Sequence, residues 1–406
     1  MNERFNSEFD IKIANTENER KKLSHLTSYA FLPSPADLTQ SQKGFESIKD
    51  AFIQSVYPKN SDSPIATASC IPMTQNVRGK IFKMGGIEAV ATQPEFRNQG
   101  IIRQLMINIF KHAKETGEVF STLFPFKESF YAKFDYISFP QTKIATIPMH
   151  KLSTVKNYKV TGIVKHYYLE KVFDEYYDFT VEMQSLIHGM STKTKETTSF
   201  INVTRPSYVA FAYLNDKITG CMVYTTKGHS EPLDVKYFYY RDSNAKYLLL
   251  QFIASHIDQF SEVWLPIRPN EVPELWLNDL NLRISTRSWS SMGMGRIINV
   301  ESLQGMTVGN GSITAKIIDK NCNWNNGIFT FKEVNNCLEV IKISNNEVKP
   351  VCSLTIAGLS ALVYGGYELG VFPFKNWILD YDAGSNCFQK LKDLFQDVLP
   401  FMHEHF

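Results

Sequence analysis

Arg97 and Gly100, in the run RNQGII at residues 97–102, stand where an apolar strand passes into a helix, and this junction can bind a phosphate. Residues 86–92 read as the strand, residues 93–99 as a polar turn, and residues 100–116 as the helix. The first N–H groups of a helix have no partner inside it and carry partial positive charge, so they attract anions. The run is neither a phosphate loop, since no GKS or GKT follows, nor a dinucleotide fingerprint, since GxGxxG is absent.

Tyr131, in the run FYAKFDY at residues 130–136, is a candidate proton donor. A phenol has an ordinary pKa of about 10, so it is protonated at neutral pH and can protonate a leaving group. The alternative is a packing tyrosine, which is common in a chain with 19 of them, and Tyr136 is the packing candidate within the same run. Glu88, on the strand before the turn, is the best local candidate for a general base.

The elements that must position these residues form a first unit, residues 1–150. Thr16 and Glu19 have the spacing of a capping box, and the helix that follows carries Leu23, Leu26 and Tyr29 towards a core. The pattern predicts strands over 10–14, 65–72, 79–83, 86–92, 119–124 and 144–148, and helices after residue 16 and over 45–54, 100–116 and 127–134. This order predicts a mixed sheet with helices on both faces.

Two further units follow. Residues 151–290 repeat the order of the first unit and suggest a degenerate duplication, with strands over 160–168, 208–215, 217–226, 234–240 and 262–266 and helices over 171–188, 244–260 and 271–280. Nothing there corresponds to RNQG, so we expect no phosphate site, only a structural unit or one that lines a substrate cleft. Residues 291–406 read as an α+β unit, with strands over 296–302, 313–319, 327–333 and 337–343 and helices over 356–364 and 389–398.

Composition bounds the function classes. The chain has 406 residues, 43% of them apolar and 21% charged, which is ordinary for a globular protein of two to three domains. A net charge of +2 gives no reason to expect a nucleic acid or an acidic membrane as partner. The six cysteines form no CxxC pair, and the sequence indicates neither a signal peptide, a membrane-spanning run nor a metal site. We therefore expect a cytoplasmic enzyme.

The strand EAVAT, the proline, the turn and the amphipathic helix together resemble the acetyl-CoA motif of the GNAT acetyltransferases, (Q/R)-x-x-G-x-(G/A). Ile102 stands where that motif has Gly or Ala. With FYAKFDY, a second GNAT-like unit and a terminal phenylalanine, this departure makes the chain similar to the enhanced intracellular survival (Eis) family. The resemblance implies two tandem GNAT-like mixed α/β units, 1–150 and 151–290, and a sterol-carrier-protein-2-like α+β domain, 291–406.

The resemblance also implies the site residues. In such proteins the turn holds the pyrophosphate of acetyl-CoA and the preceding strand pairs with the pantetheine arm. The residues that match, or lie beside this path, are Val90, Ala91, Thr92, Arg97, Asn98, Gln99, Gly100, Ile101, Ile102, Arg103, Phe126 and Lys127. Tyr131 matches the family's general acid. The family's base is the C-terminal carboxylate, here that of Phe406, and the tail LPFMHEHF is more apolar than a solvated tail.

The implied function is acetyl-CoA-dependent N-acetylation of primary amines, aminoglycoside-like or polyamine-like, by direct transfer in a homohexamer. Phe31, Asp37 and Glu404 are candidate acceptor contacts, and His405 stands where the family often has an acidic residue. The alternatives are a lipid or small-molecule binding protein with a non-catalytic GNAT shape, and a protein-lysine acetyltransferase. Leu359, Leu362 and Val363, with residues 372–377, would line a lipid tunnel, although core packing is the preferred reading.

Overall fold

The computed structural model describes residues 5, 7–32, 50–198, 207–280, 282–286, 292–344, 348–382, 384 and 386–402. The chain divides into two compact units. The first consists of Met1–Ser138, Gly293–Val398 and Glu404–Phe406, and the second of Phe139–Met292 and Leu399–His403. Each unit therefore draws on segments that are distant in sequence.

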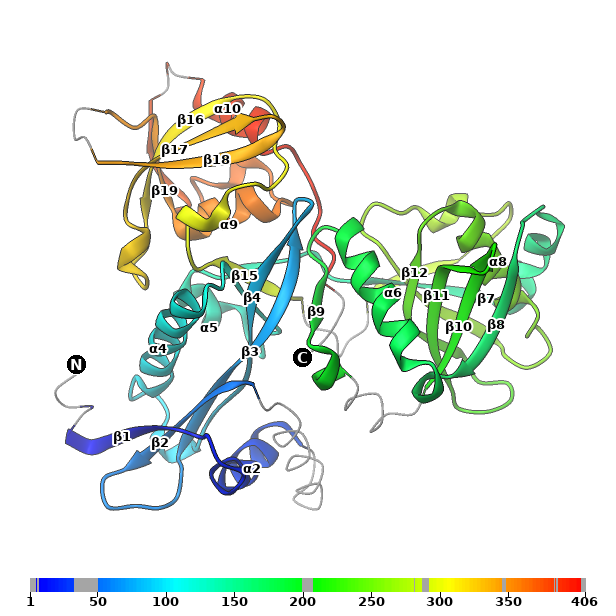
Figure 1. The fold of residues 1–406 in the computed structure, drawn as a ribbon, viewed down its shortest axis with the longest axis horizontal. Helices are drawn as coiled ribbons and strands as arrows, with labels where there is room; N and C mark the ends of the chain where they lie inside the picture. Colours follow the sequence, from blue (N-terminus) through cyan, green and yellow to red (C-terminus); the bar gives the residue numbers. More distant parts are fainter. Residues whose placement is uncertain are drawn as a thin grey trace. The chain divides into compact units, whose positions relative to one another are not determined.

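The N-terminal sheet of the first unit has the order β1-β2-β3-β4-β5-β15-β6 (Figure 1). Along this order the β4–β5 pair is parallel and the other pairs are antiparallel. Its strands are β1 (Phe9–Ile13), β2 (Phe52–Pro58), β3 (Ala66–Val77), β4 (Lys80–Thr92), β5 (Phe120–Leu123), β15 (Met294–Ile297) and β6 (Ile137–Ser138). The strands predicted over 79–83 and 86–92 are one strand, β4, because Met84 and Gly85 continue its ladder with β3.

The helices of this region follow their local signals. Thr16 and Glu19 form the expected capping box at the start of α2 (Glu17–Phe31). The apolar face of α4 (Ile101–Thr116) is buried in the core, and α5 (Glu128–Tyr131) passes directly into the 3₁₀ turn η3 (Ala132–Phe134). The helix predicted over 45–54 is wrong at residues 52–54, where β2 begins; residues 45–49 lie outside the described part of the chain.

Two strands belong to sheets other than those predicted. β7 (Lys143–Pro148), expected in the first unit, pairs with β13 and β14 in the second. β15, which covers the start of the strand predicted over 296–302 in the third unit, lies between β5 and β6 of the N-terminal sheet. Both strands are internal to their sheets, and a buried apolar strand of this kind fits inside either sheet, so local patterning identifies a strand but not its neighbours.

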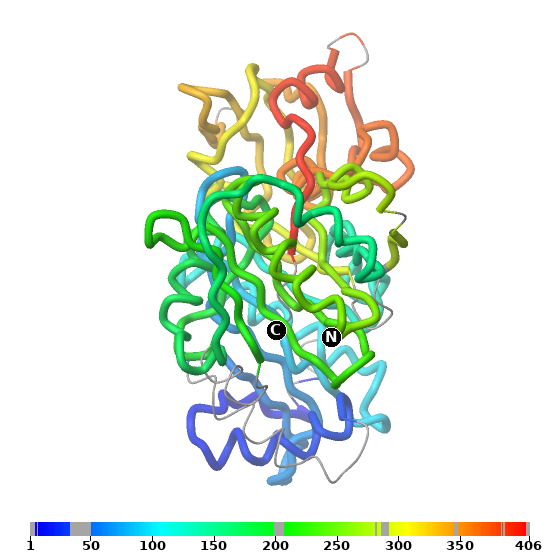
Figure 2. The backbone as a smooth tube through the Cα atoms, turned by 90° about the vertical axis from the view of Figure 1, so that its right-hand side faces the viewer, coloured from blue at the N-terminus to red at the C-terminus, as the bar shows by residue number. Residues whose placement is uncertain are grey.

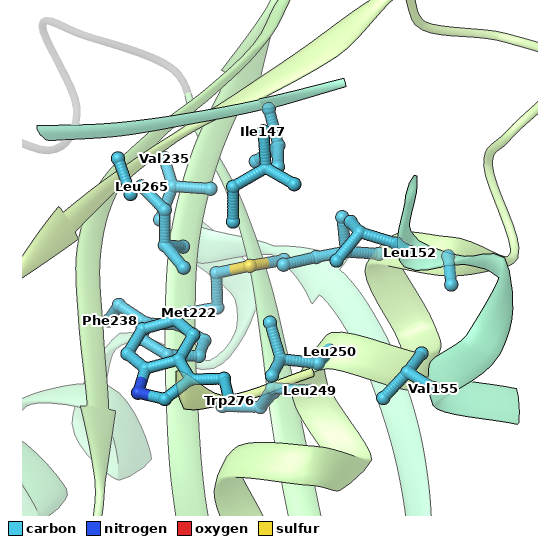
Figure 3. Close-up of a cluster of buried hydrophobic side chains, with 14 of the residues drawn as sticks. Ile147, Leu152, Val155, Met222, Val235, Phe238, Leu249, Leu250, Leu265 and Trp276 are labelled. Atoms are coloured by element: carbon cyan, nitrogen blue, oxygen red, sulfur yellow. The ribbon is translucent and has the colours of Figure 1, made fainter. Parts of the chain in front are cut away.

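The second unit has its own sheet, of order β14-β7-β13-β12-β11-β10-β8. Around the core drawn in Figure 3, the side chains of Met222, Leu249, Leu265 and Trp276 gather from strands, helix and loop. The unit contains β8 (Ile163–Tyr168), α6 (Phe173–Leu186), β9 (Ser191–Lys193), β10 (Tyr208–Leu214), β11 (Lys217–Thr226), β12 (Leu233–Tyr240), α8 (Ser243–Ala254), β13 (Glu262–Ile267) and β14 (Arg283–Thr286).

The C-terminal part of the first unit builds another sheet, of order β18-β17-β16-β19-β20. In Figures 1 and 2 its yellow-to-orange strands form a layer apart from the blue and cyan ones. Its elements are β16 (Ser312–Ile318), β17 (Gly327–Val334), β18 (Cys337–Ile343), β19 (Cys352–Thr355), α9 (Ile356–Tyr364), β20 (Ile378–Tyr381) and α10 (Cys387–Leu394). Every residue of α9 is buried, as its nearly continuous apolar sequence requires. Among the described helices, none is long and apolar enough to cross a membrane.

Candidate functional site

Strands β4 and β5 separate part of the way along their length. They pair in parallel from Met84–Phe120 to Ile87–Leu123, and β4 then continues to Thr92. No further pairing between them is present in the described residues. The main chain of β4 from Ala89 to Thr92 therefore has no strand partner on its β5 side in the described part of the sheet, and this edge can pair with another molecule.

A β-bulge lies where the two strands part. In the β3–β4 ladder Ser69 faces Glu88 and Thr67 faces Ala91, so Ala89 and Val90 together oppose one residue of β3. Ala89 has a φ of 53°, in the left-handed region that is uncommon for any residue other than glycine. Bulges and left-handed residues cost free energy and concentrate at functional sites.

The N–H groups of residues 98–103, from the end of the turn to the start of α4, have no hydrogen-bond partner in the described part of the chain, whereas those of Phe96 and Arg97 donate to the Gln93 and Pro94 carbonyls. Asn98 has a φ of 64° and Gly100 one of 81°, and Gly100, as N-cap, has no side chain to bond the helix start. Glycine suits this left-handed position because it has no Cβ. Successive N–H groups in such a turn make a concave anion site, to which the helix dipole adds.

A cavity of about 980 Å³ lies along the free edge of β4 and the start of α4. Two of the predicted cofactor contacts, Gln99 and Lys127, are not part of its wall. The other ten line it: Val90, Ala91, Thr92, Arg97, Asn98, Gly100, Ile101, Ile102, Arg103 and Phe126. Phe31, a predicted acceptor contact, lies in the same wall.

The wall suits a phosphorylated, elongated ligand. Arg97 and Arg103 bring positive charge to it. Thr92 Oγ1 is buried and has no hydrogen-bond partner within the described part of the chain, a costly state unless a water or ligand bonds it. The chain thus supplies donors, positive charge and a free strand edge together. Among the described residues, no group of three or more His, Cys, Asp or Glu side chains could hold a metal ion.

Tyr131 ends α5 and is 3% exposed. Its ring lies 5.7 Å from that of Phe126 and 5.1 Å from that of Phe130, both of which line the cavity. Burial raises the pKa of the Tyr131 phenol above its ordinary value. The phenol therefore keeps its proton throughout the neutral range, as a proton donor must.

Tyr136 is engaged elsewhere. Its hydroxyl lies 2.7 Å from Ser121 Oγ, which donates to the Gly85 carbonyl under the sheet. Burial raises the pKa of this phenol too. The structure thus separates the two tyrosines of FYAKFDY: Tyr131 lies beside the cavity wall and Tyr136 is bonded into the core.

The candidate bases are described only in part. Glu88 lies half-buried at the bulge. Asp37, Glu404 and Phe406 fall outside the described residues, so their predicted roles stay predictions. The C-terminal residues just before Glu404 pack within the second unit. Phe401 and Met402 are buried there, and the Phe401 N–H donates to the His188 carbonyl at 2.8 Å. This burial agrees with the apolar character noted for the tail.

Several wall residues were not predicted as cofactor contacts. Tyr29 was expected to face a core, yet it is 69% exposed and lines the cavity. Phe96, Phe130, Lys133 and Phe134 also line it. Phe130, Lys133 and Phe134 belong to the run FYAKFDY, so taking the whole run as part of the site would have predicted them.

Comparison with known proteins agrees with this geometry. Residues 11–138 match the family model described as Acetyltransferase (GNAT) domain. Among curated proteins, the uncharacterized protein BU181 of Buchnera aphidicola is 27% identical over 113 residues, which are 28% of this chain and 45% of that protein. The chain thus spans less than half the length of that relative.

Solved structures match almost the whole chain. A GCN5-related N-acetyltransferase from Anabaena variabilis superposes with a TM-score of 0.82 at 19% identity, over 98% of this chain and 100% of that one. One from Kribbella flavida gives 0.80 at 18%, over 98% and 99%. Eis1 from Mycobacterium abscessus gives 0.78 at 14%, over 98% and 100%.

At such identities the likeness shows the fold alone. The mixed α/β GNAT fold is confirmed, while the sterol-carrier likeness and membership of the Eis family stay predictions. Residues 11–138 therefore resemble a GNAT acetyltransferase domain in both sequence and fold.

Proposed function

We propose that this protein is an acetyl-CoA-dependent N-acetyltransferase that acts on primary amines by direct transfer. One observation carries the proposal: a single cavity brings together the free edge of β4, the uncapped start of α4 and the aromatic wall beside Tyr131. A thioester bound there would supply the activated acyl group. The chain itself has to hold that thioester and move two protons.

Holding the donor falls to main-chain groups. The N–H groups from Asn98 to Arg103 bind the pyrophosphate, and the side chains of Arg97 and Arg103 add positive charge. The backbone of Val90 to Thr92 pairs with the pantetheine amides, because this edge of β4 lacks a strand partner in the described part of the sheet. Main-chain recognition of this kind is independent of side-chain identity, which accommodates Ile102.

Tyr131 gives the departing thiolate its proton. A thiol has an ordinary pKa of about 8.5, well below that of a buried phenol, so complete transfer is uphill and must accompany bond cleavage. Because its pKa is raised, the Tyr131 phenol stays protonated until the thiolate leaves. The hydrogen bond it offers stabilises charge as it develops on sulfur.

The incoming amine must lose a proton before or as it attacks. The Phe406 carboxylate is the base we propose from the Eis resemblance, and Glu88 at the bulge is the local alternative. Adding two residues after Phe406 moves that carboxylate and should nearly abolish turnover while coenzyme A still binds. Unchanged turnover would instead favour Glu88.

Thiol release from acetyl-CoA, measured with a panel of polyamines and aminoglycosides, tests the function. We expect acetylation of at least one small amine. Turnover only with peptide lysines would indicate the protein-lysine acetyltransferase, and lipid co-purifying with no turnover on any amine would indicate the carrier. Leu359, Leu362 and Val363, the proposed tunnel residues, are buried within α9, which fits core packing.

A further inference from the structure

A buried arginine lies directly behind the turn that follows Tyr131. Arg296, on β15, has a fully buried side chain. Its Nη1 donates to the Phe134 carbonyl at 2.6 Å, and its Nη2 donates to Asp319 Oδ2 at 2.6 Å. The guanidinium also lies over the Phe110 ring of α4, 4.5 Å from the centroid. One side chain thus joins the Tyr131 turn, the helix of the cofactor cavity and the loop after β16.

That loop makes a second bond to the same turn. Asn321 Nδ2 donates to Asp135 Oδ2 at 2.9 Å. Asp135 has a φ of 63°, a left-handed conformation that costs free energy and persists only where the surroundings hold it. Asn321 itself is fixed, because its backbone N–H donates to Asp319 Oδ1 at 3.0 Å. Asp319 therefore orders both side chains that grip the turn.

The turn connects these bonds to the phenol. Tyr136 N–H donates to the Tyr131 carbonyl at 3.4 Å, so residues 131–136 close into one loop. Arg296 holds that loop at Phe134 and Asn321 holds it at Asp135. A shift of either anchor would move the backbone that carries the Tyr131 ring.

Stability alone does not account for such a network. Removing an ion pair from water is costly, and apolar residues of similar volume often serve stability equally well. Within the described part of the chain Asn321 Oδ1 has no hydrogen-bond partner, but the other bonds of the network hold the turn from two sides. Such buried bonds fix one backbone geometry, and proton transfer depends on geometry. Arg296 and Asn321 lie 165 and 190 positions after Tyr131 in the sequence, so the fold brings them to this turn from beyond the second unit.

We propose that Arg296 and Asn321 are positioning residues for the Tyr131 phenol, so that a loop of the C-terminal sheet sets the geometry of the acid in the GNAT domain. The inference rests on the proposed function, in which Tyr131 protonates the leaving thiolate. Neither residue touches the reacting groups; each acts through the main chain of the turn.

Asn321→Ala and Arg296→Lys test the proposal kinetically. Asn321→Ala removes one anchor and leaves the fully buried Arg296–Asp319 ion pair intact, so it is the variant more apt to fold. Because displacements of about 1 Å can cost roughly 100-fold in rate, we expect kcat to fall at least about tenfold, with KM for acetyl-CoA within about twofold. A wild-type kcat in both variants would overturn the inference.

Arg78→Lys is the matched control. Arg78 is also buried in the first unit, and it donates to the carbonyls of Leu362, Val363 and Gln396. These hydrogen bonds join Arg78 to residues of the C-terminal part of the unit, so its replacement should lower thermal stability and leave kcat unchanged. An equal fall of kcat in Arg78→Lys would mean that loss of stability alone explains the effect.

A double-mutant cycle adds a readout specific to Tyr131. If Asn321 acts through the phenol, Asn321→Ala should have little further effect on kcat once Tyr131 is phenylalanine. Full additivity of the two losses would contradict the proposal.

A measurement without turnover separates this inference from the proposed function. With 3-fluorotyrosine placed at position 131, the ¹⁹F resonance should shift or split in Asn321→Ala and stay in place in Arg78→Lys. An unmoved resonance in Asn321→Ala overturns the positioning role even in an active enzyme. A wild type without transferase activity would sink the proposed function, and the resonance would still decide whether the network holds the ring.

Discussion

The N-terminal sheet and the sheet of the second unit each have a strand that leads into a helix beside a parallel neighbour, but the two helices begin with different residues. In the second unit β12 pairs in parallel with β13 only at Leu233 and Asp234, then continues to Tyr240 and leads into α8. β4, β5 and α4 have the same arrangement. The N-cap of α4 is Gly100, without a side-chain bond, whereas the N-cap of α8 is Asp242, whose carboxylate accepts from Ala245 N–H at 2.8 Å.

This difference shows how the same strand–helix arrangement can either leave the start of the helix open to an anion or close it. An aspartate cap satisfies a free donor and puts negative charge where a phosphate would sit. A glycine cap leaves the N–H donors of the helix start unbonded and leaves room for a phosphate beside them. In addition, Val235, Phe238 and Leu265 from β12 and β13 pack with Trp276 in the core of the second unit (Figure 3). The first junction opens on a cavity, and the second contributes to a core.

The largest expected effect concerns the acid of the first unit. Tyr131→Phe should lower kcat by about 10²- to 10⁴-fold, the usual share of a general acid, while the affinity for coenzyme A is kept. Steady-state thiol release and calorimetry measure the two quantities. Tyr240→Phe in the second unit, also at a buried tyrosine, is the control and should keep kcat. A wild-type rate in Tyr131→Phe would remove Tyr131 as the acid.

Giving the first junction the cap of the second is the next test. Gly100→Asp should weaken acetyl-CoA binding by roughly 10- to 100-fold, because a hydrogen bond to a charged group contributes about 1.5–3 kcal/mol and the new carboxylate repels phosphate. Titration calorimetry measures the change. Gly100→Ala is the companion variant, since it adds the strain of a left-handed Cβ without the charge, and it should bind better than Gly100→Asp. Equal affinities would assign the effect to strain alone.

Removing the cap of the second junction should act on stability alone. Asp242→Ala should cost about 1 kcal/mol of unfolding free energy, the usual value of an N-cap. Chemical denaturation measures it. We expect kcat and coenzyme A affinity to stay at wild-type values, and a second bound coenzyme A in this variant would show that the cap alone had closed that site.

The smallest expected effect concerns the alkaline side of the pH profile, where titration of Tyr131 should cause no loss of rate. The raised pKa of Tyr131 means that the protonated, donating form persists below that value and is lost only well above pH 10. The kcat–pH profile should therefore show no loss of the acid up to about pH 10. A falling limb near pH 8 that disappears in Tyr131→Phe would contradict this reading.

Local features could be read from the sequence. The capping box of α2, the amphipathic face of α4, and α9, which begins after Thr355 as expected, each depend on residues within one turn or two of helix. The same holds for the turn at Asn98 and Gly100. The family resemblance of FYAKFDY predicted Tyr131 as the acid, and in the structure its ring lies beside the cavity wall.

Long-range features could not be read in this way. The sequence predicted strands over 144–148 and 296–302, yet the sheets that β7 and β15 join depend on pairing energies over the whole chain. The bulge at Ala89 has no local signature, because alanine is not a residue that favours φ above zero. Arg296 reads as an ordinary charged residue until Phe134, Asp319 and Phe110 surround it. The domain limits, the hexamer and the role of Phe406 stay predictions.

A structure determined with coenzyme A bound would test the central claim most directly. The account predicts one coenzyme A per chain, with its diphosphate on the N–H groups of Asn98 to Arg103, its pantetheine along Val90 to Thr92 and its sulfur within hydrogen-bond reach of the Tyr131 hydroxyl. A diphosphate bound at the start of α8, or a sulfur remote from Tyr131, would contradict it.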